Sequence, residues 1–374
     1  MLGFALPLLA LELSGTGTGL ALIKGAGFIP NIFFATFVGV INDQMRKATG
    51  FRVYSLMLAV VSGLLWVLLA IDRINIGGLA LLMIGLNAVG YAIGNLQFTL
   101  LRLTVPQDRL SDATALGSAI NATITTVGPA VAGFTLLSLG HAGLVAGVTL
   151  LLLTSALAAF TITPEEKLPH PAPFWPSLRA GFPAFAGNRE LVMMTCAVVL
   201  TNAASGAFLV GLLLKLKTGL GANDFETGLV LAAAGVGSVI AASFAPGIRR
   251  TFGARTAFFW PIWILAALYL AIGAAPTVAV LVIFSFAQGA VMLFYDIGIW
   301  SYRQESTDAA HMGRVAGITG AIFKLLMPPV IFLAGWLADA GAITAVFWTA
   351  AAINVTAALF LSYVGKWGWP RLGG

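Results

Sequence analysis

The stretch GVINDQMRK at residues 39–47 ends one apolar segment with a glycine, an acid and a basic pair, and it runs directly into the next apolar segment. A related stretch, GIRRTFGAR at residues 247–255, lies in the same kind of place in the second half of the chain. A basic turn that recurs between apolar segments predicts two homologous halves that face each other. Such an arrangement suits the movement of a solute better than a chemical reaction on it.

The composition of the chain indicates an integral membrane protein. Apolar residues make up 59% of the 374 residues, charged residues only 9%, and the mean hydropathy is +0.96. A soluble domain carries roughly 25% charged residues, so this chain cannot cover its surface with groups that water solvates. Apolar runs of about 20 residues recur, the length that a helix needs to cross a bilayer. The runs do not alternate in polarity, which favours helices over the strands of a membrane barrel.

Twelve membrane-spanning helices are predicted from these runs. Their predicted bounds are 1–13, 18–41, 52–71, 77–101, 112–138, 143–162, 191–214, 227–247, 256–274, 276–301, 313–337 and 342–364. If the loops lie alternately on two sides, one side receives most of the Lys and Arg residues and the other receives only Arg73, Lys215 and Lys217. Because cytoplasmic loops carry the excess of Lys and Arg, the basic side is predicted to be cytoplasmic, with the central linker and the C-terminus on it. The net charge of +6 is therefore a topology signal and not a nucleic-acid surface.

The first predicted span, residues 1–13, is too short to cross a bilayer, because a helix of this length covers only ~20 Å. A secretory signal peptide is one interpretation, although the basic leader of such a peptide is missing here. The other is a first helix whose cytoplasmic half is missing. We expect the second, a truncated first helix.

The segment 164–190 differs in composition from the rest, with six prolines among charged residues. Proline at this density gives a semi-rigid connector. Matching features recur on either side of it, since Arg102 and Arg303 each end a span (303 − 102 = 201), and Pro129 and Pro329 each lie within one. We expect an all-α membrane protein of two pseudo-symmetric six-helix bundles. Its parts are an N-terminal half with an incomplete first helix at 1–163, a cytoplasmic linker at 164–190 and a C-terminal half at 191–374.

Five short motifs along the chain match one family pattern. They are Gly39, Asp43 and Lys47 between the second and third spans, VPQDRLS at 105–111, GPAVAG at 128–133, GRV at 313–315 and GWLAD at 335–339. On these motifs the chain resembles the major facilitator superfamily of transporters over essentially its whole length. The resemblance is to the drug- and siderophore-exporter branch that includes the enterobactin exporter. It implies the major facilitator fold, in which the fourth and tenth spans help to line a central cavity.

The resemblance also implies a gate. In the family, the first motif gates the cytoplasmic side, and the Gly-Pro motif of the fifth span is associated with export by antiport. We expect the gating residues to be Gly39, Asp43, Arg46, Lys47, Gly128, Pro129, Arg249 and Arg250. Because the stretch around Gly247 has no acid, Asp43 is expected to be an asymmetric latch that bonds near the start of the eleventh span. The alternative is a helix cap confined to its own loop.

Four ionisable side chains lie inside predicted spans: Glu12, Lys24, Asp296 and Lys324. Charged groups are costly in hydrocarbon, so such residues are functional candidates by default. Asp296 is expected to titrate protons, and an ion pair with Lys324 or Arg303 is the structural alternative. Lys324 is expected to attract an anion or to balance charge. Lys24 and Glu12 are expected to be structural, through snorkelling or mutual pairing.

Matched polar stripes on two related spans predict the solute site. On the tenth span they are Gln288, Met292, Tyr295 and Asp296, and on the fourth span, 201 residues earlier, they are Asn87, Tyr91 and Asn95. The spacing places each set on one face of its helix. Symmetry-related polar faces predict a site between the halves. Hydrogen bonds between helices are the alternative explanation for the Asn and Gln residues.

Weaker candidates are Asn202 on the seventh span and Asn121 on the fifth, each either a cavity wall or an ordinary helix contact. The three histidines fall in predicted loops and form no metal-ligand pattern. No nucleotide-binding loop is present, so ATP hydrolysis is not expected to supply the energy. We expect no cofactor and no metal.

The expected function is secondary active transport, not catalysis. The chain is expected to export a small amphipathic or anionic organic molecule, such as a siderophore or a drug, by proton-coupled alternating access. The expected partners are that small-molecule substrate, protons and the lipid bilayer, without nucleic acid, for a monomer in the plasma (inner) membrane. The alternatives are a flippase for lysophospholipid or other lipids, a proton-driven importer and a non-transporting membrane assembly factor.

Overall fold

The computed structural model describes residues 1–34, 38, 41–42, 45–163, 182–183, 185–307 and 312–364, and this part of the chain contains helices but no strand. The predicted all-α class is therefore confirmed. The first group of helices is α1 (Leu2–Ser14), α2 (Gly17–Ala26), α3 (Ile29–Phe33), α5 (Lys47–Ala70), α6 (Ile76–Thr104) and α7 (Leu110–Ala159). The second group is α9 (Arg189–Leu214), α10 (Asp224–Ala242), α11 (Ala245–Ala274), α12 (Val278–Glu305), α13 (Met312–Ile322), α14 (Met327–Asp339) and α15 (Ile343–Val364).

Nine helical segments of the described residues are long and apolar enough to cross a membrane. Helices α7 and α11 each cover parts of two predicted spans, and in each of them a glycine lies between the two parts. Gly140 has φ +66° inside α7, at the boundary between the predicted fifth and sixth spans. Gly253 has φ +74° inside α11, just before the predicted ninth span. A positive φ is accessible to glycine without steric cost, so the chain turns sharply at both positions.

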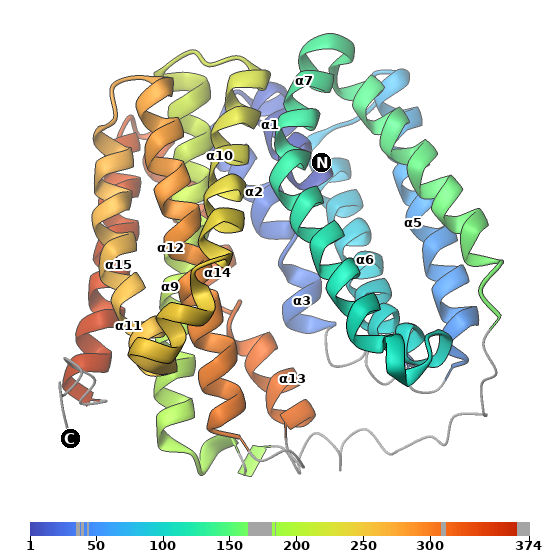
Figure 1. Ribbon diagram of the computed structural model, residues 1–374. Helices are drawn as coiled ribbons and strands as arrows, with labels where there is room; N and C mark the ends of the chain where they lie inside the picture. Colours follow the sequence, from blue (N-terminus) through green and yellow to red (C-terminus); the bar gives the residue numbers. More distant parts are fainter. Residues whose placement is uncertain are drawn as a thin grey trace.

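The helices form two bundles that stand side by side, as Figure 1 shows. Helices α1 to α7 make one bundle, the N-terminal half, in which α5 packs against α6 and α7. Helices α9 to α15 make the other, the C-terminal half, in which α10 packs against α12 and α9 against α15. We name the two ends of the molecule by a residue on each. The Asp339 end is where α14 ends and α2 begins, and the Arg102 end is where α6 ends.

Two of the predicted spans are broken helices, which corrects their prediction as continuous segments. The second span divides into α2 and α3 at Gly27, and the eleventh divides into α13 and α14 at residues 323–326. Prolines stand at the start of each second piece, at Pro30 in α3 and at Pro328 and Pro329 in α14. A proline has no N–H for the carbonyl four residues earlier, so the helix is interrupted there.

The two halves meet along two pairs of helices, α7 with α10 and α2 with α14. Glycines make both contacts close. A Cβ atom on Gly335 of α14 would lie 2.6 Å from the Gly17 carbonyl oxygen of α2, and one on Gly133 of α7 would overlap the Asp224 carbonyl of α10. Small residues at such positions let helix backbones approach in a membrane, where packing rather than water drives association. Both contacts reach the Asp339 end, so the halves are packed together there.

Candidate functional site

The two broken helices face each other and are joined by one hydrogen bond at their breaks. The Lys324 Nζ atom, between α13 and α14, donates to the Asn31 Oδ1 atom of α3 at 3.0 Å. Lys324 lies inside the apolar span Ile318–Asp339, six residues after its start and fifteen before its end. This bond connects the N-terminal half to the C-terminal half. We call the region around the two breaks the break site.

Asn202 satisfies a carbonyl that the break in the eleventh span leaves free. The Met327 N–H bonds the Lys324 carbonyl instead of the Phe323 carbonyl, which a regular helix would use. The Asn202 Nδ2 atom of α9 donates to the Phe323 carbonyl at 3.1 Å. Irregular backbone at membrane depth needs such partners, because lipid offers none. Asn202, a weak candidate from sequence, is therefore part of the break site.

Replacing Asn202 with Leu is expected to destabilise the protein, because the Phe323 carbonyl would lose its partner. Such a loss costs about 1–2 kcal/mol in a membrane protein. Asn95→Leu is the matched control, because Asn95 is exposed and its Nδ2 atom bonds only Tyr91 of its own helix at 3.1 Å. The melting temperature of the purified protein in detergent should fall for Asn202→Leu and stay near that of the parent protein for Asn95→Leu. Equal melting temperatures would remove this role for Asn202.

The polar stripe of the fourth span reaches the break site only at Asn87. Its Nδ2 atom bonds the Met83 carbonyl at 2.9 Å, and a Cβ atom on Gly27 would lie 3.4 Å from the same nitrogen. Asn87 therefore stands beside the break in the second span. Tyr91 is partly exposed further along α6, and Asn95 is exposed.

The polar residues of the tenth span lie in three different environments. The Tyr295 hydroxyl bonds Thr201, and its ring stacks on Phe258 at 5.3 Å, so Tyr295 belongs to the interior of the C-terminal half. Gln288 lines a small cavity between α9, α10 and α12. Asp296 is partly exposed and makes no hydrogen bond or ion pair with the residues that the structure describes.

Neither ion pair weighed for Asp296 forms. Lys324 bonds Asn31, as above. The Arg303 Nη1 atom lies 3.4 Å from the Thr319 hydroxyl, and its guanidinium lies over the Trp300 ring at 4.2 Å. Asp296 is thus a carboxylate within a span whose charge no described side chain balances.

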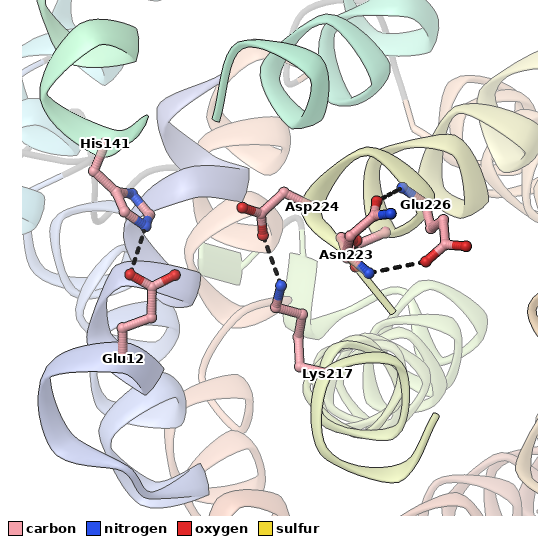
Figure 2. Close-up of polar contacts among 7 residues, drawn as sticks. Glu12, His141, Lys217, Asn223, Asp224 and Glu226 are labelled. Atoms are coloured by element: carbon pink, nitrogen blue, oxygen red, sulfur yellow. Dashed lines mark hydrogen bonds and ion pairs between the residues drawn. The ribbon is translucent and has the colours of Figure 1, made fainter. Parts of the chain in front are cut away.

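Of the two structural roles weighed for Lys24, snorkelling and pairing with Glu12, the pairing does not form, because antiparallel α1 and α2 place Lys24 and Glu12 at opposite ends of α1. The Lys24 Nζ atom lies 3.4 Å from the Gly3 carbonyl near the start of α1. The Glu12 Oε2 atom lies 3.1 Å from the His141 Nε2 atom at the kink of α7. Figure 2 shows this contact. His141, predicted to lie in a loop and outside any metal-ligand pattern, therefore contacts the carboxylate of another helix.

The gating residues are described in part. Lys47 begins α5 and its Nζ atom bonds the Asn42 carbonyl, while Arg46 is the exposed residue before it. Arg250 is exposed, and Asn121 is exposed on α7. Gly39, Asp43 and the Arg249 side chain lie outside the described residues, so the latch at Asp43 stays a prediction.

A different acid joins the halves at the opposite end. The Asp339 Oδ2 atom, at the end of α14, accepts from the Thr18 N–H at 2.9 Å, and its Oδ1 atom accepts from the Gly17 N–H. Asp339 therefore caps the start of α2, whose first N–H groups have no partner within the helix. In the sequence, Asp339 is marked only as the last residue of the GWLAD motif at 335–339. Its signal was an acid at the end of a span, as at Asp43.

Charged groups around Asp339 bond within each half. In the C-terminal half, Lys217 lies 2.7 Å from Asp224, and Asn223 and Glu226 exchange bonds in a capping box at the start of α10. Figure 2 shows these two contacts together with the Glu12–His141 contact of the N-terminal half. Among the residues that the structure describes, no cluster of three or more His, Cys, Asp or Glu side chains is placed to hold a metal ion.

Two helix bundles that meet at broken, glycine-lined helices define a class of protein, the membrane transporters with binding groups between two halves. The family model of the Major Facilitator Superfamily matches residues 1–325, and the chain belongs to this superfamily. It is a multi-pass membrane transporter and not an enzyme.

Two solved transporters are similar in structure to the whole chain. A variant of the nucleoside transporter NupG is 14% identical with a TM-score of 0.72, and the match covers 96% of this chain and 95% of that one. The POT family transporter PepTSo is 12% identical with a TM-score of 0.74, covering 94% and 90%. At these identities the likeness shows the fold. No curated protein matches the sequence.

Proposed function

We propose that this transporter carries a small organic anion by proton-coupled alternating access, in the direction of export. The observation that supports the proposal is the bond between Lys324 and Asn31 at the two helix breaks. A lysine inside a membrane span is costly unless it serves a solute or an ion. Discontinuous helices near the bilayer midplane are the usual place for substrate and coupling-ion sites in secondary transporters.

The Lys324 ammonium suits an anionic group of the solute. It bonds only a neutral amide among the described residues, so its charge is available to a ligand that displaces Asn31. Because Lys324 and Asn31 belong to different halves, a solute that binds there changes how the halves are held together. An amphipathic anion, such as a catechol-type siderophore component, fits a charged centre surrounded by apolar helices.

Asp296 is the proposed proton carrier. It is partly exposed within α12 and no described cation neutralises it. Carboxylates inside the spans of transporters commonly relay protons. Its charge can therefore alternate between two states during transport, which is what coupling to a proton gradient requires.

Differences between the two ends of the molecule support a proposed orientation in the membrane and a proposed conformational state. The Arg102 end carries most of the Lys and Arg side chains, so it is proposed to be cytoplasmic. The contacts between halves at Gly335, Gly133 and Asp339 all belong to the Asp339 end. This arrangement fits a form that is closed to the outside.

Replacing Asp296 with Asn is expected to abolish transport driven by a pH gradient but to leave solute exchange intact. Exchange moves no net proton, so it does not need a titrating group. Proteoliposomes with the anion 2,3-dihydroxybenzoate as probe, and the cation ethidium beside it, measure both modes. Glu12→Gln is the matched control, because Glu12 contacts His141 near the Asp339 end. Gradient-driven flux that survives Asp296→Asn would remove this carboxylate from coupling, and transport of ethidium alone would remove the anion preference.

A further inference from the structure

A small cavity lies inside the C-terminal half, between α9, α10 and α12, and its mostly apolar wall carries three polar side chains. Its volume is about 190 Å³, and Ser205, Phe208, Leu212, Val230, Ser285 and Gln288 are among the residues that line it. Cavities for drug-sized ligands measure about 300–1,000 Å³, so this one holds only part of a solute. One water occupies about 30 Å³, so the space is much larger than a single buried water needs.

The Ser285 hydroxyl in this cavity has no hydrogen-bond partner among the residues that the structure describes, although Ser285 is only 1% exposed. Hydroxyls on membrane helices ordinarily bond the carbonyl four residues earlier. Thr195 and Thr319 do so in the same half, at 2.8 and 2.7 Å. Ser285 differs from them and leaves a buried polar atom unsatisfied, which costs free energy unless a ligand or water bonds it.

Further buried polar groups stand behind the cavity wall. The Tyr269 hydroxyl lies beside Ser205 of the wall and beside Asn354 of α15. Tyr269 and Asn354 are fully buried, and both amide atoms of Asn354 lack a hydrogen-bond partner within the described part of the chain. The Tyr269 ring stacks on Phe208, whose side chain lines the cavity, at 4.2 Å. The wall thus combines neutral hydrogen-bonding groups with an aromatic face.

We propose that this cavity binds an uncharged hydrogen-bonding group of the transported solute, a hydroxyl or a carboxamide. The polar side chains that line it are Ser205, Ser285 and Gln288, and all three are neutral. They donate and accept hydrogen bonds. A carboxylate or an ammonium group would lose its hydration here without gaining an opposite charge.

This inference rests on the proposed function and refines the substrate class. The solute then has two parts, an anionic group near Lys324 and a neutral polar group held by Gln288 and Ser285. Gln288 and Asp296 lie on the same side of α12 about 12 Å apart along its axis, at 1.5 Å per residue. The neutral group would therefore bind on the Asp339 side of the proton carrier.

Alkylation of a cysteine placed in the cavity tests this specificity. The native cysteine is first removed by Cys196→Ser, and Ser285→Cys then places a thiol on the wall with little change in volume. The probes are iodoacetamide and iodoacetate, which differ in carrying a carboxamide or a carboxylate. Thr218→Cys, exposed at the Asp339 end, is the control for the intrinsic rates of the two reagents.

The amide-to-acid rate ratio in the cavity is expected to exceed the control ratio by about tenfold, since one neutral hydrogen bond is worth up to about that factor. Adding Gln288→Leu should return the ratio to the control value. A ratio that Gln288→Leu leaves unchanged would overturn the proposal, because desolvation of the acid alone would explain it. Equal ratios, or a thiol that neither reagent reaches, would also overturn it.

A second position guards against a variant that fails to fold. Ser205→Cys places the thiol on the α9 wall of the same cavity, and the same ratios are expected. Both measurements use the full chain in detergent without a gradient. They therefore report on the cavity even if the proteoliposome assay shows no flux, so failure of the proposed function and failure of this inference are separate results.

Discussion

Replacing Asp339 with Asn is expected to open the Asp339 end of the transporter. Asn keeps one acceptor oxygen, but its NH₂ group cannot accept from the second N–H at the start of α2, where Gly17 and Thr18 now donate to the carboxylate. Hydrogen bonds to charged groups contribute about 1.5–3 kcal/mol each. Because every 1.4 kcal/mol changes an equilibrium about tenfold, the ratio of open to closed forms should rise by roughly tenfold to a hundredfold.

Distances between spin labels measure this shift directly. Labels at Leu139→Cys in the N-terminal half and Thr218→Cys in the C-terminal half, with Cys196→Ser, report on the separation of the Asp339 end. Asp224→Asn is the matched control, since Asp224 lies at the same end but pairs with Lys217 of its own half. An unchanged distance distribution in Asp339→Asn, or the same change in Asp224→Asn, would show that Asp339 does not hold the halves together.

Replacing Gly133 with Ala is expected to have an effect of similar size at the second contact between the halves. The new Cβ atom would occupy the space of the Asp224 carbonyl, so α7 and α10 must separate. Overpacking typically costs about 1–3 kcal/mol. A methyl group cannot be accommodated by a side-chain movement here, because the obstructing atoms belong to the backbone. The same labels should therefore report a more open Asp339 end and a lower melting temperature.

Gly128→Ala on the same helix is the control for this prediction. A Cβ atom on Gly128 would meet nothing within 4 Å, so this change carries no clash. Replacing glycine by alanine inside a helix otherwise stabilises it by roughly 0.5–1 kcal/mol. The two variants should thus change stability in opposite directions. If Gly133→Ala behaved like Gly128→Ala, the close approach of α7 to α10 would not limit this interface.

Gly128 and Gly133 show that the role implied for the GPAVAG motif at 128–133 differs from the contacts that its residues make in the structure. The resemblance implied a gating role for Gly128 and Pro129. The structure places Pro129 in the interface, where its carbonyl meets Gly228 of α10, but leaves space around Gly128. The closest contact falls at Gly133, at the other end of the motif. Which glycine a partner helix approaches depends on the angle and register at which the two helices pack. A local sequence motif determines neither of these.

The helices and their order were predictable because each span satisfies its own backbone hydrogen bonds and its apolar length must match the bilayer. Both conditions are local. The breaks in the second and eleventh spans also have a local signal, the prolines at Pro30 and at Pro328 and Pro329. They were not predicted, because each break lies inside an apolar run that resembles one continuous span. Asp296 and Lys324 were found as candidates because a charge within an apolar run stands out in any sequence of this kind.

The contacts that individual polar residues make could be identified only from the tertiary structure. The sequence by itself determined that the chain is a helical membrane protein with two similar halves, because hydropathy and charge act along the chain. The fold decided that Lys324 bonds Asn31, that Asp339 caps α2 and that Ser285 lines a cavity without a hydrogen-bond partner among the described residues. Each of these facts depends on which faces of distant helices meet, and that is set by packing between small residues rather than by the composition of either helix.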